Sequence, residues 1–175
     1  MVTTDSLARL GRIARAAGAA ILAHYRRPGT VSFKNDRSPL TEADRSAHRV
    51  LVAALLEWDP AVRVVSEEGD IPPYEERSRW ERFWLVDPLD GTKEFLHQND
   101  EFTVNVALVV GDAPVLGVVY APARDLLYSA GSGLGAWKQQ WEPGRFACIQ
   151  DRARPGQLSW WPRADHIRPR SSRRT

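Results

Sequence analysis

The sequence predicts an α+β layered fold in which helices pack on a mostly antiparallel sheet. Two segments with helical periodicity come first, within residues 3–58, and each gathers its apolar side chains on one face. Short apolar runs separated by turn residues follow between residues 62 and 130, as is typical of strands joined by hairpins. The chain has 175 residues, of which 43% are hydrophobic, so we expect one domain with a sizeable core and not two ordinary domains.

The first helix is predicted over Thr3–Tyr25 and is ended by Pro28-Gly29. Its apolar face consists of Leu7, Leu10, Ala14, Ala17, Ile21 and Tyr25. The second helix begins at Thr41, where Asp44 follows three residues on, as in a capping box, and Asp59-Pro60 stops it. Its apolar face consists of Ala47, Val50, Leu51, Ala54, Leu55 and Trp58. Each helix therefore offers one apolar stripe that a sheet can cover.

The strands are predicted from short β-branched and apolar runs. Three of them precede the centre of the chain, at Val31–Lys34, Val62–Ser66 and Phe83–Val86, with a short helix at Glu75–Arg82. Three more runs form an antiparallel meander with turns at Gly111-Asp112 and Arg124-Asp125, and they span Phe102–Val110, Pro114–Pro122 and Asp125–Ala130. This order places the sheet mostly after the helices.

The last 35 residues differ from the rest of the chain. Residues 141–175 carry eight Arg and three acidic residues, a charge of +5, against −3 for residues 1–140. They show neither helical nor strand periodicity, and we expect them to form a poorly ordered Arg-rich tail behind an αβ domain at 1–140. An Arg-rich arm that binds nucleic acid is the alternative, although the basic pI of 8.9 comes from this segment alone and is weak evidence for such a partner.

Cysteine content and hydropathy suggest a cytoplasmic location. Cys148 is the single cysteine, so an internal disulfide is excluded, which fits a reducing compartment. No apolar run approaches the length of a membrane span, and residues 1–20 lack the core of a signal peptide.

Four acidic residues stand at predicted loop ends: Asp36, Glu67, Asp87 and Asp90. Any one of them alone would be read as a turn or cap residue. Glu67 and Asp87 each follow a short strand, however, and strands of one sheet bring their ends side by side. Converging carboxylates repel each other and raise each other's pKa unless a cation lies among them. Ligands that are all oxygen suit Mg²⁺, Ca²⁺ or Mn²⁺.

Gly91 and Thr92 follow directly after these acids. A glycine allows a ligand to approach the backbone, and the N–H groups of a turn or of a helix that begins near Thr92 bind anions. Simple helix capping by Thr92 is the plainer reading. A metal cluster beside an anion site is the arrangement that phosphate-ester hydrolysis requires.

The stretch WLVDPLDGTKEF, residues 84–95, resembles the W-x-x-D-P-[LI]-D-G-T-x-x-F signature of the inositol monophosphatase superfamily of lithium-sensitive, metal-dependent phosphatases. SEEG, residues 66–69, resembles the upstream acidic motif of that superfamily. KNDRSPLTEAD and EFTVNVALVVGDAPVLGVVYAPA, at 34–44 and 101–123, narrow the resemblance to the CysQ-type 3'(2'),5'-bisphosphate nucleotidases. The resemblance covers Leu7 to about Lys138.

This resemblance implies an αβαβα sugar-phosphatase-like fold, of which the chain supplies the first αβ domain. It also implies Mg²⁺-dependent removal of the 3'-phosphate from adenosine 3',5'-bisphosphate (PAP) to give AMP, with two to three ions and with Mn²⁺ as an alternative. The expected partner is a small phosphate ester, with no nucleic acid and no transmembrane segment. Family members are often dimers, so a homodimer is one expectation.

Matching positions imply the metal ligands. Glu67, Asp87 and the carbonyl of Leu89 would bind the first ion, and Asp87 and Asp90 the second. Glu67 would also reach a third, weaker site through water.

The resemblance likewise implies roles for the remaining residues. Asp36 and Thr92 would orient and deprotonate the attacking water, and the backbone of Gly91 and Thr92 would hold the phosphate. Asp44 is read as a capping-box residue and left outside the site.

The chain also departs from the family pattern. Family members continue into a second αβ domain with a W-D-x-A motif whose Asp completes the second metal site. In this sequence the W-D-x-A match at 58–61 precedes the signature at 84–95, and none follows it. The chain is therefore expected to be truncated or frameshifted after about residue 140, with impaired activity.

Several alternatives stay open at this point. An inositol monophosphatase-like phosphatase of sugar phosphates and a non-catalytic remnant both compete with the nucleotidase. A phosphatase that forms an aspartyl-phosphate is excluded, because its nucleophile would have to be at position 88, which is proline.

Overall fold

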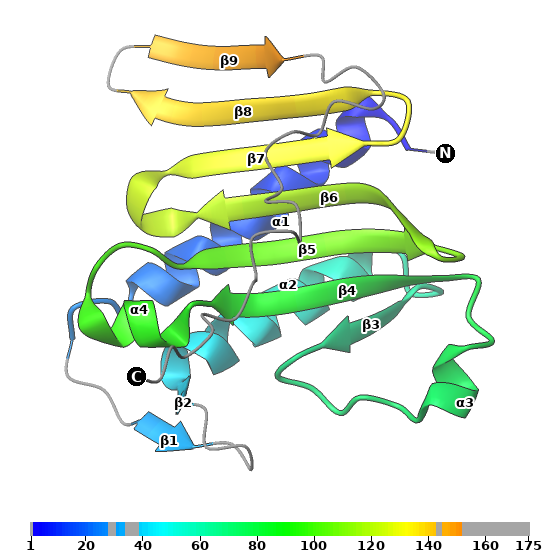
Figure 1. The fold of residues 1–175 in the computed structure, drawn as a ribbon, viewed down its shortest axis with the longest axis horizontal. Coiled ribbons are helices and arrows are strands. Elements are labelled where there is room, and N and C mark those ends of the chain that lie inside the picture. The colour runs from blue at the N-terminus through cyan, green and yellow to red at the C-terminus, as the bar shows by residue number, and fades with distance from the viewer. Residues whose placement is uncertain (1, 28–30, 34–38, 143–144, 152–175) are drawn as a thin grey trace, which may run out of the picture.

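A computed structural model of the chain describes residues 2–27, 31–33, 39–142 and 145–151. Its main element is a seven-stranded sheet with the order β3-β4-β5-β6-β7-β8-β9. β3 pairs in parallel with β4, and every other neighbouring pair in this sheet is antiparallel. Figure 1 shows the two long helices behind this sheet. The predicted layered α+β class with a mostly antiparallel sheet is confirmed.

The elements have the following bounds. In chain order they are α1 (Thr4–Leu22), β1 (Val31–Phe33), β2 (Pro39–Thr41), α2 (Glu42–Trp58), β3 (Arg63–Ser66), α3 (Tyr74–Arg77), β4 (Arg82–Asp90), α4 (Thr92–His97), β5 (Thr103–Val110), β6 (Ala113–Ala121), a 3-10 turn (Pro122–Arg124), β7 (Leu126–Gly131), β8 (Gly135–Glu142) and β9 (Arg145–Asp151). β1 and β2 form a separate antiparallel pair. Within the described parts of the chain, no helix is long and apolar enough to cross a membrane.

Both long helices begin with a capping box. The Thr3 hydroxyl accepts from the Ser6 N–H, and the Ser6 side chain accepts in return from the Thr3 N–H. Thr41 and Asp44 make the same exchange at the start of α2, as the sequence predicts. These exchanges satisfy backbone donors that the first turn of a helix leaves without partners.

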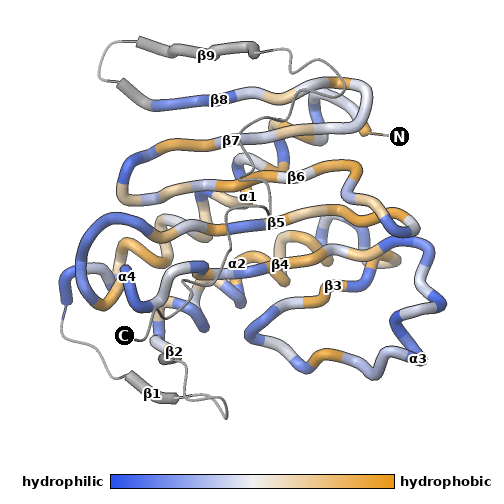
Figure 2. The backbone as a smooth tube through the Cα atoms, viewed as in Figure 1, coloured by the Kyte–Doolittle hydropathy of each residue, from blue (hydrophilic) through white to orange (hydrophobic). Residues whose placement is uncertain are grey.

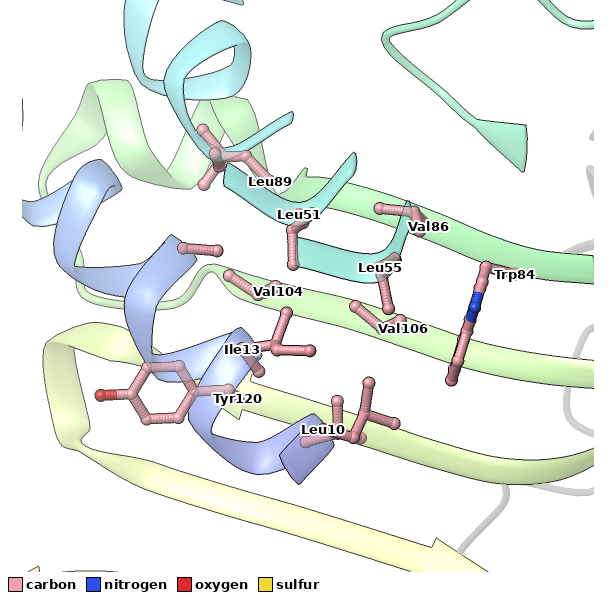
Figure 3. Packing of buried hydrophobic residues seen from close by; sticks show 14 of the residues in the cluster. Leu10, Ile13, Leu51, Leu55, Trp84, Val86, Leu89, Val104, Val106 and Tyr120 are labelled. Carbon is pink, nitrogen blue, oxygen red and sulfur yellow. The ribbon is translucent and has the colours of Figure 1, made fainter. Parts of the chain in front are cut away.

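The core lies between the two helices and one face of the sheet. Figure 3 shows side chains from α1, α2 and the central strands meeting there, among them Leu10, Leu51, Trp84 and Val104. α1 approaches β6 so closely that a Cβ at Gly18 would come within 2.4 Å of the Tyr120 ring. Burial of this apolar surface is the main stabilising contribution to the fold.

The opposite face of the sheet carries apolar side chains that remain accessible. Leu85, Val119 and Tyr128 are 49%, 41% and 45% exposed, and each alternates along its strand with a buried neighbour. Figure 2 shows long hydrophobic stretches on β6 and β7, whereas β8 is hydrophilic over part of its length. Of the described helices, both long ones lie on the other face.

The sheet extends further than the sequence predicts. β4 continues through the acidic motif to Asp90, and β8 forms although Lys138, Gln139 and Gln140 interrupt its apolar pattern. β9 lies within the segment expected to lack structure, yet it pairs with β8 from Arg145 to Asp151. The exposed edge of β8 offers backbone hydrogen bonds to any extended segment, whatever its side chains. The expectation of an unstructured tail from residue 141 therefore fails for β9, and residues 152–175 lie outside the described ones.

Candidate metal and phosphate site

Three acidic residues, Glu67, Asp87 and Asp90, form an acidic cluster at the carboxyl ends of β3 and β4. These two strands run in parallel, with Ser66 opposite Val86. Glu67, directly after β3, therefore lies beside Asp87 of β4, and the Glu67 N–H donates to the Val86 carbonyl over 3.1 Å. The convergence expected from the sequence arises from this parallel pairing.

Asp87 lies in the most unfavourable electrostatic environment of the acidic cluster. Burial, followed by the neighbouring charges of Glu67 and Asp90, raises the pKa of Asp87 to about 7. Its Oδ1 atom is buried and has no hydrogen-bond partner in the part of the chain that the structure describes. A buried carboxylate oxygen without a partner is costly. A divalent cation would satisfy this atom and offset the repulsion, so the residues present fit such an ion.

The donor set is of the kind that binds hard cations, since it consists of carboxylate oxygens and one backbone carbonyl, that of Leu89. Within the described residues, however, no three His, Cys, Asp or Glu side chains are arranged closely enough to hold an ion together. The structure thus brings the predicted acids to one end of the sheet without placing them in coordination geometry.

A bulge shapes the end of β4. Asp87 pairs with Asn105 of β5 and Asp90 pairs with Thr103, so the register shifts between the two aspartates. Three residue steps on β4, from Asp87 to Asp90, thus face two steps on β5, from Asn105 to Thr103. The extra residue in β4 bends the strand. The Leu89 carbonyl oxygen, within this bulge, lies 3.3 Å from the Thr92 hydroxyl and is one of two acceptors within reach of its single proton, the other being Asp44 Oδ1 at 3.1 Å.

Gly91 turns the chain from β4 into α4. Its φ of 92° and ψ of 42° lie in the left-handed region, which favours glycine. A Cβ at this position would also lie 3.0 Å from the Glu101 carbonyl oxygen. Position 91 therefore requires glycine both for its backbone conformation and for the close approach of the loop before β5.

Thr92 contacts Asp44, a residue that sequence reasoning left outside the site. The Thr92 hydroxyl donates to Asp44 Oδ1 over 3.1 Å, and Asp44 is 1% exposed. Asp44 Oδ2 meanwhile accepts from the Thr41 N–H and hydroxyl. The capping box uses only Oδ2 of Asp44, so Oδ1 is available to Thr92. The sequence does not reveal this second contact, because the capping box already accounts for an Asp at position 44.

Asp36, predicted as the partner of Thr92, lies outside the described residues. His48, read from the sequence as a surface or boundary residue, contacts the buried Ser66 hydroxyl over 2.8 Å through its Nδ1 atom. Ser66 directly precedes Glu67, so this contact supports the end of β3 beside the acidic cluster.

Comparison with known proteins adds evidence beyond the geometry. The family model described as "Inositol monophosphatase family" matches residues 5–160. This chain belongs to the inositol monophosphatase family. The match extends past residue 140, where the family resemblance was expected to end, and it includes β8 and β9.

Relatives within the inositol monophosphatase family include bacterial proteins named 3'(2'),5'-bisphosphate nucleotidase CysQ. The chain is 48% identical over 146 residues to that of Shigella flexneri, with 82% of this chain and 58% of the relative covered. It is 51% identical over 131 residues to that of Escherichia coli K12, with 74% and 52% covered. The chain thus spans about half the length of the curated relatives that it matches.

Solved structures agree with this family placement. A crystal structure of CysQ from Bacteroides thetaiotaomicron superposes with a TM-score of 0.65 and 45% identity, covering 79% of this chain and 51% of the other. An IMPase from Thermotoga maritima gives a TM-score of 0.70 at 29% identity, covering 86% and 54%. The layered fold of this chain is therefore that of the family.

Proposed function

We propose that this chain forms the metal- and phosphate-binding part of a Mg²⁺-dependent phosphatase that removes the 3'-phosphate of PAP to give AMP. The observation that carries the proposal is the buried Asp87 Oδ1 without a partner among the described residues, next to Glu67 and Asp90 and four residues before the Gly91 turn. The names of the relatives at 48% and 51% identity support a 3'(2'),5'-bisphosphate nucleotide as substrate.

The acidic cluster would hold the ions. Glu67, Asp87 and the Leu89 carbonyl are proposed for the first ion, and Asp87 with Asp90 for the second, with two to three ions in total and Mn²⁺ as an alternative. Bound divalent ions lower the pKa of water and stabilise the oxygen that leaves the phosphorus. The role of these residues is to fix the positions of the ions.

Thr92 is proposed to orient the attacking water. Its hydroxyl has a single proton, and while that proton points to Asp44 the oxygen lone pairs are available to accept a hydrogen bond from water. As the water loses a proton to Thr92, Thr92 can pass its own to Asp44, whose carboxylate then becomes neutral. Asp36 remains the candidate that the sequence suggests for the same role. Comparing Asp44→Asn with Asp36→Asn distinguishes the two carboxylates.

Gly91 and Thr92 are proposed to bind the substrate phosphate through their backbone N–H groups. They stand at the start of α4, where the first N–H groups have no acceptor within the helix.

Location and assembly belong to the same proposal. The single cysteine excludes an internal disulfide and is consistent with a location in the cytoplasm. Exposed Leu85, Val119 and Tyr128 on the uncovered sheet face would favour self-association, such as a homodimer. Size-exclusion chromatography with light scattering measures this directly.

The test combines metal binding with phosphate release from PAP. Calorimetric titration should detect Mg²⁺ binding to the parent chain and none to Asp87→Asn, which keeps the shape but loses the charge. Asp112→Asn, in the exposed turn between β5 and β6, is the matched control and should behave like the parent. Equal heats for Asp87→Asn and the parent would refute the metal site. Faster release from inositol monophosphate than from PAP would favour the sugar-phosphate alternative.

A further inference from the structure

Beside the acidic cluster, β5 presents two polar side chains on the face of the sheet away from the core. Thr103 and Asn105 are two residues apart and therefore point to the same side of the strand. Between and after them, Val104 and Val106 are 0% and 2% exposed and point into the core. The pairing register places Asn105 opposite Asp87, and Thr103 opposite Asp90.

These two side chains form a chain of hydrogen bonds that ends on Asp90. The Asn105 amide donates from Nδ2 to Asp90 Oδ2 over 3.1 Å. The Thr103 hydroxyl donates to Asn105 Oδ1 over 3.1 Å. Asn105 thus contacts the aspartate beyond the bulge, although its direct neighbour across the strands is Asp87.

We propose that Asn105 is a positioning residue for the carboxylate of Asp90, and that Thr103 holds the Asn105 amide in the orientation that serves this role. The inference rests on the metal site proposed above and goes beyond it, because neither residue belongs to the expected ligands. A hydrogen bond from outside the ligand shell restricts the rotation of a ligating carboxylate and thereby prepares it for the ion.

The chemistry of an amide suits this position. The Asn105 NH₂ group donates to Asp90 without bringing a positive charge that would compete with a divalent ion. It occupies Oδ2 and leaves Oδ1 for the ion. A lysine or arginine at position 105 would form a salt bridge with Asp90 and oppose binding of the cation.

Thr103 supports the orientation in which the NH₂ end of the amide faces Asp90. An amide that is flipped by 180° would turn its carbonyl oxygen toward the carboxylate, and two acceptors would then repel each other. The Asp90 carboxylate only accepts hydrogen bonds and therefore selects the orientation that directs the NH₂ group to it, and in that orientation the Thr103 hydroxyl donates to Asn105 Oδ1. The bulge of β4 shifts the register so that Asp90 lies opposite Thr103, and this position allows the hydrogen bond between Asp90 and Asn105.

The test measures Mn²⁺ binding to the 175-residue chain by the loss of the free-ion electron paramagnetic resonance signal. Removing an outer-shell partner typically weakens metal binding about 10- to 100-fold, and Asn105→Ala should fall near the lower end because its hydrogen bond is accessible to water. Asn99→Ala is the matched control, since the Asn99 side chain accepts from the Glu101 N–H in the loop before β5, and it should leave the affinity unchanged.

Thr103 provides a second, independent variant pair. Thr103→Val keeps the shape but removes the donor and should weaken Mn²⁺ binding by less than Asn105→Ala. Thr103→Ser keeps the hydroxyl and removes the methyl group, and it should have the affinity of the parent. If only the methyl group mattered, Thr103→Ser would bind Mn²⁺ more weakly than the parent. This pair keeps the proposal falsifiable if Asn105→Ala fails to fold.

The outcomes separate this inference from the proposed metal site. Asn105→Ala with parental Mn²⁺ affinity and melting temperature overturns the positioning role, while Asp87→Asn without Mn²⁺ binding leaves the metal site standing. Thr103→Val and Thr103→Ser with equal affinity overturn the role of the hydroxyl. Unchanged Mn²⁺ binding in Asp87→Asn refutes the metal site and this inference with it.

Discussion

Thr92 and Asp44 are 48 positions apart in the sequence, and the hydroxyl of the first donates to a carboxylate oxygen of the second over 3.1 Å. The contact joins the first turn of α4 to the first turn of α2. It gives Asp44 two functions, since the same side chain caps α2 with its other oxygen.

We predict that Asp44→Asn lowers the rate of phosphate release by about two to three powers of ten, the usual contribution of a positioned proton acceptor. Mg²⁺ affinity should change little, because Asp44 is outside the acidic cluster. The cap is weakened too, at a cost of about 1 kcal/mol. Thr3→Ala, which removes the corresponding cap of α1, controls for this loss of stability. A rate for Asp44→Asn equal to that of Thr3→Ala would contradict the proton role.

A second prediction concerns Gly91. Gly91→Ala should destabilise the chain by about 1–3 kcal/mol, because the positive φ is strained for alanine and its Cβ would lie 3.0 Å from the Glu101 carbonyl. Gly111→Ala separates these causes, since Gly111 has a φ of 61° but no atom within 4 Å of an added Cβ. Urea unfolding should show a larger loss for Gly91→Ala. Equal losses would mean that the close approach contributes nothing.

The sequence predicts some parts of this site and misses others for identifiable reasons. The meeting of Glu67 and Asp87 is predictable, because each follows a short apolar strand and adjacent parallel strands end together. The contact of Asp44 with Thr92 is hidden, because a capping box fully explains an Asp three residues after Thr41. Asn105 is hidden as well, since a polar residue that alternates with valines looks like an ordinary outward-facing strand position.

The fold follows the same logic. The long helices α1 and α2 are predictable because the apolar period and the caps agree. β8 is not predictable, because polar residues break its alternation of apolar side chains. β9 is not predictable either, because its pairing with β8 depends on backbone hydrogen bonds, which leave no pattern in the sequence. Asp36 lies outside the described residues, so its predicted role stays a prediction.

A third prediction follows from the electrostatics of Asp87. Its pKa is raised from 3.8 to about 7, mainly by burial and then by Glu67 and Asp90. Between these two pH values the folded state binds more protons than the unfolded state, so this group makes the metal-free chain less stable as the pH rises from about 4 to 7. Above pH 7 the contribution no longer changes.

Unfolding by urea in the presence of a chelator, at pH 5 and at pH 8, measures this effect. Asp87→Asn carries no titrating group at this position, so its stability should fall less than that of the parent over the same interval. Mg²⁺ should bind the parent more weakly below pH 7, because protons compete for the carboxylate. Identical pH profiles for the two proteins would contradict the assigned burial and charge environment.

A last prediction concerns turnover. No W-D-x-A motif, whose Asp is expected from family resemblance to complete the second metal site, follows the signature at 84–95, and the chain spans about half the length of its CysQ relatives. Losing one charge contact in the transition state typically costs about two to three powers of ten in rate. We therefore expect the 175-residue chain to release phosphate from PAP at least 100-fold more slowly than the CysQ of Escherichia coli, when both are assayed side by side with Mg²⁺. The Asp87→Asn chain sets the background of the assay, so any release above it belongs to the proposed site. Comparable turnover by the two proteins would show that these 175 residues suffice for the reaction.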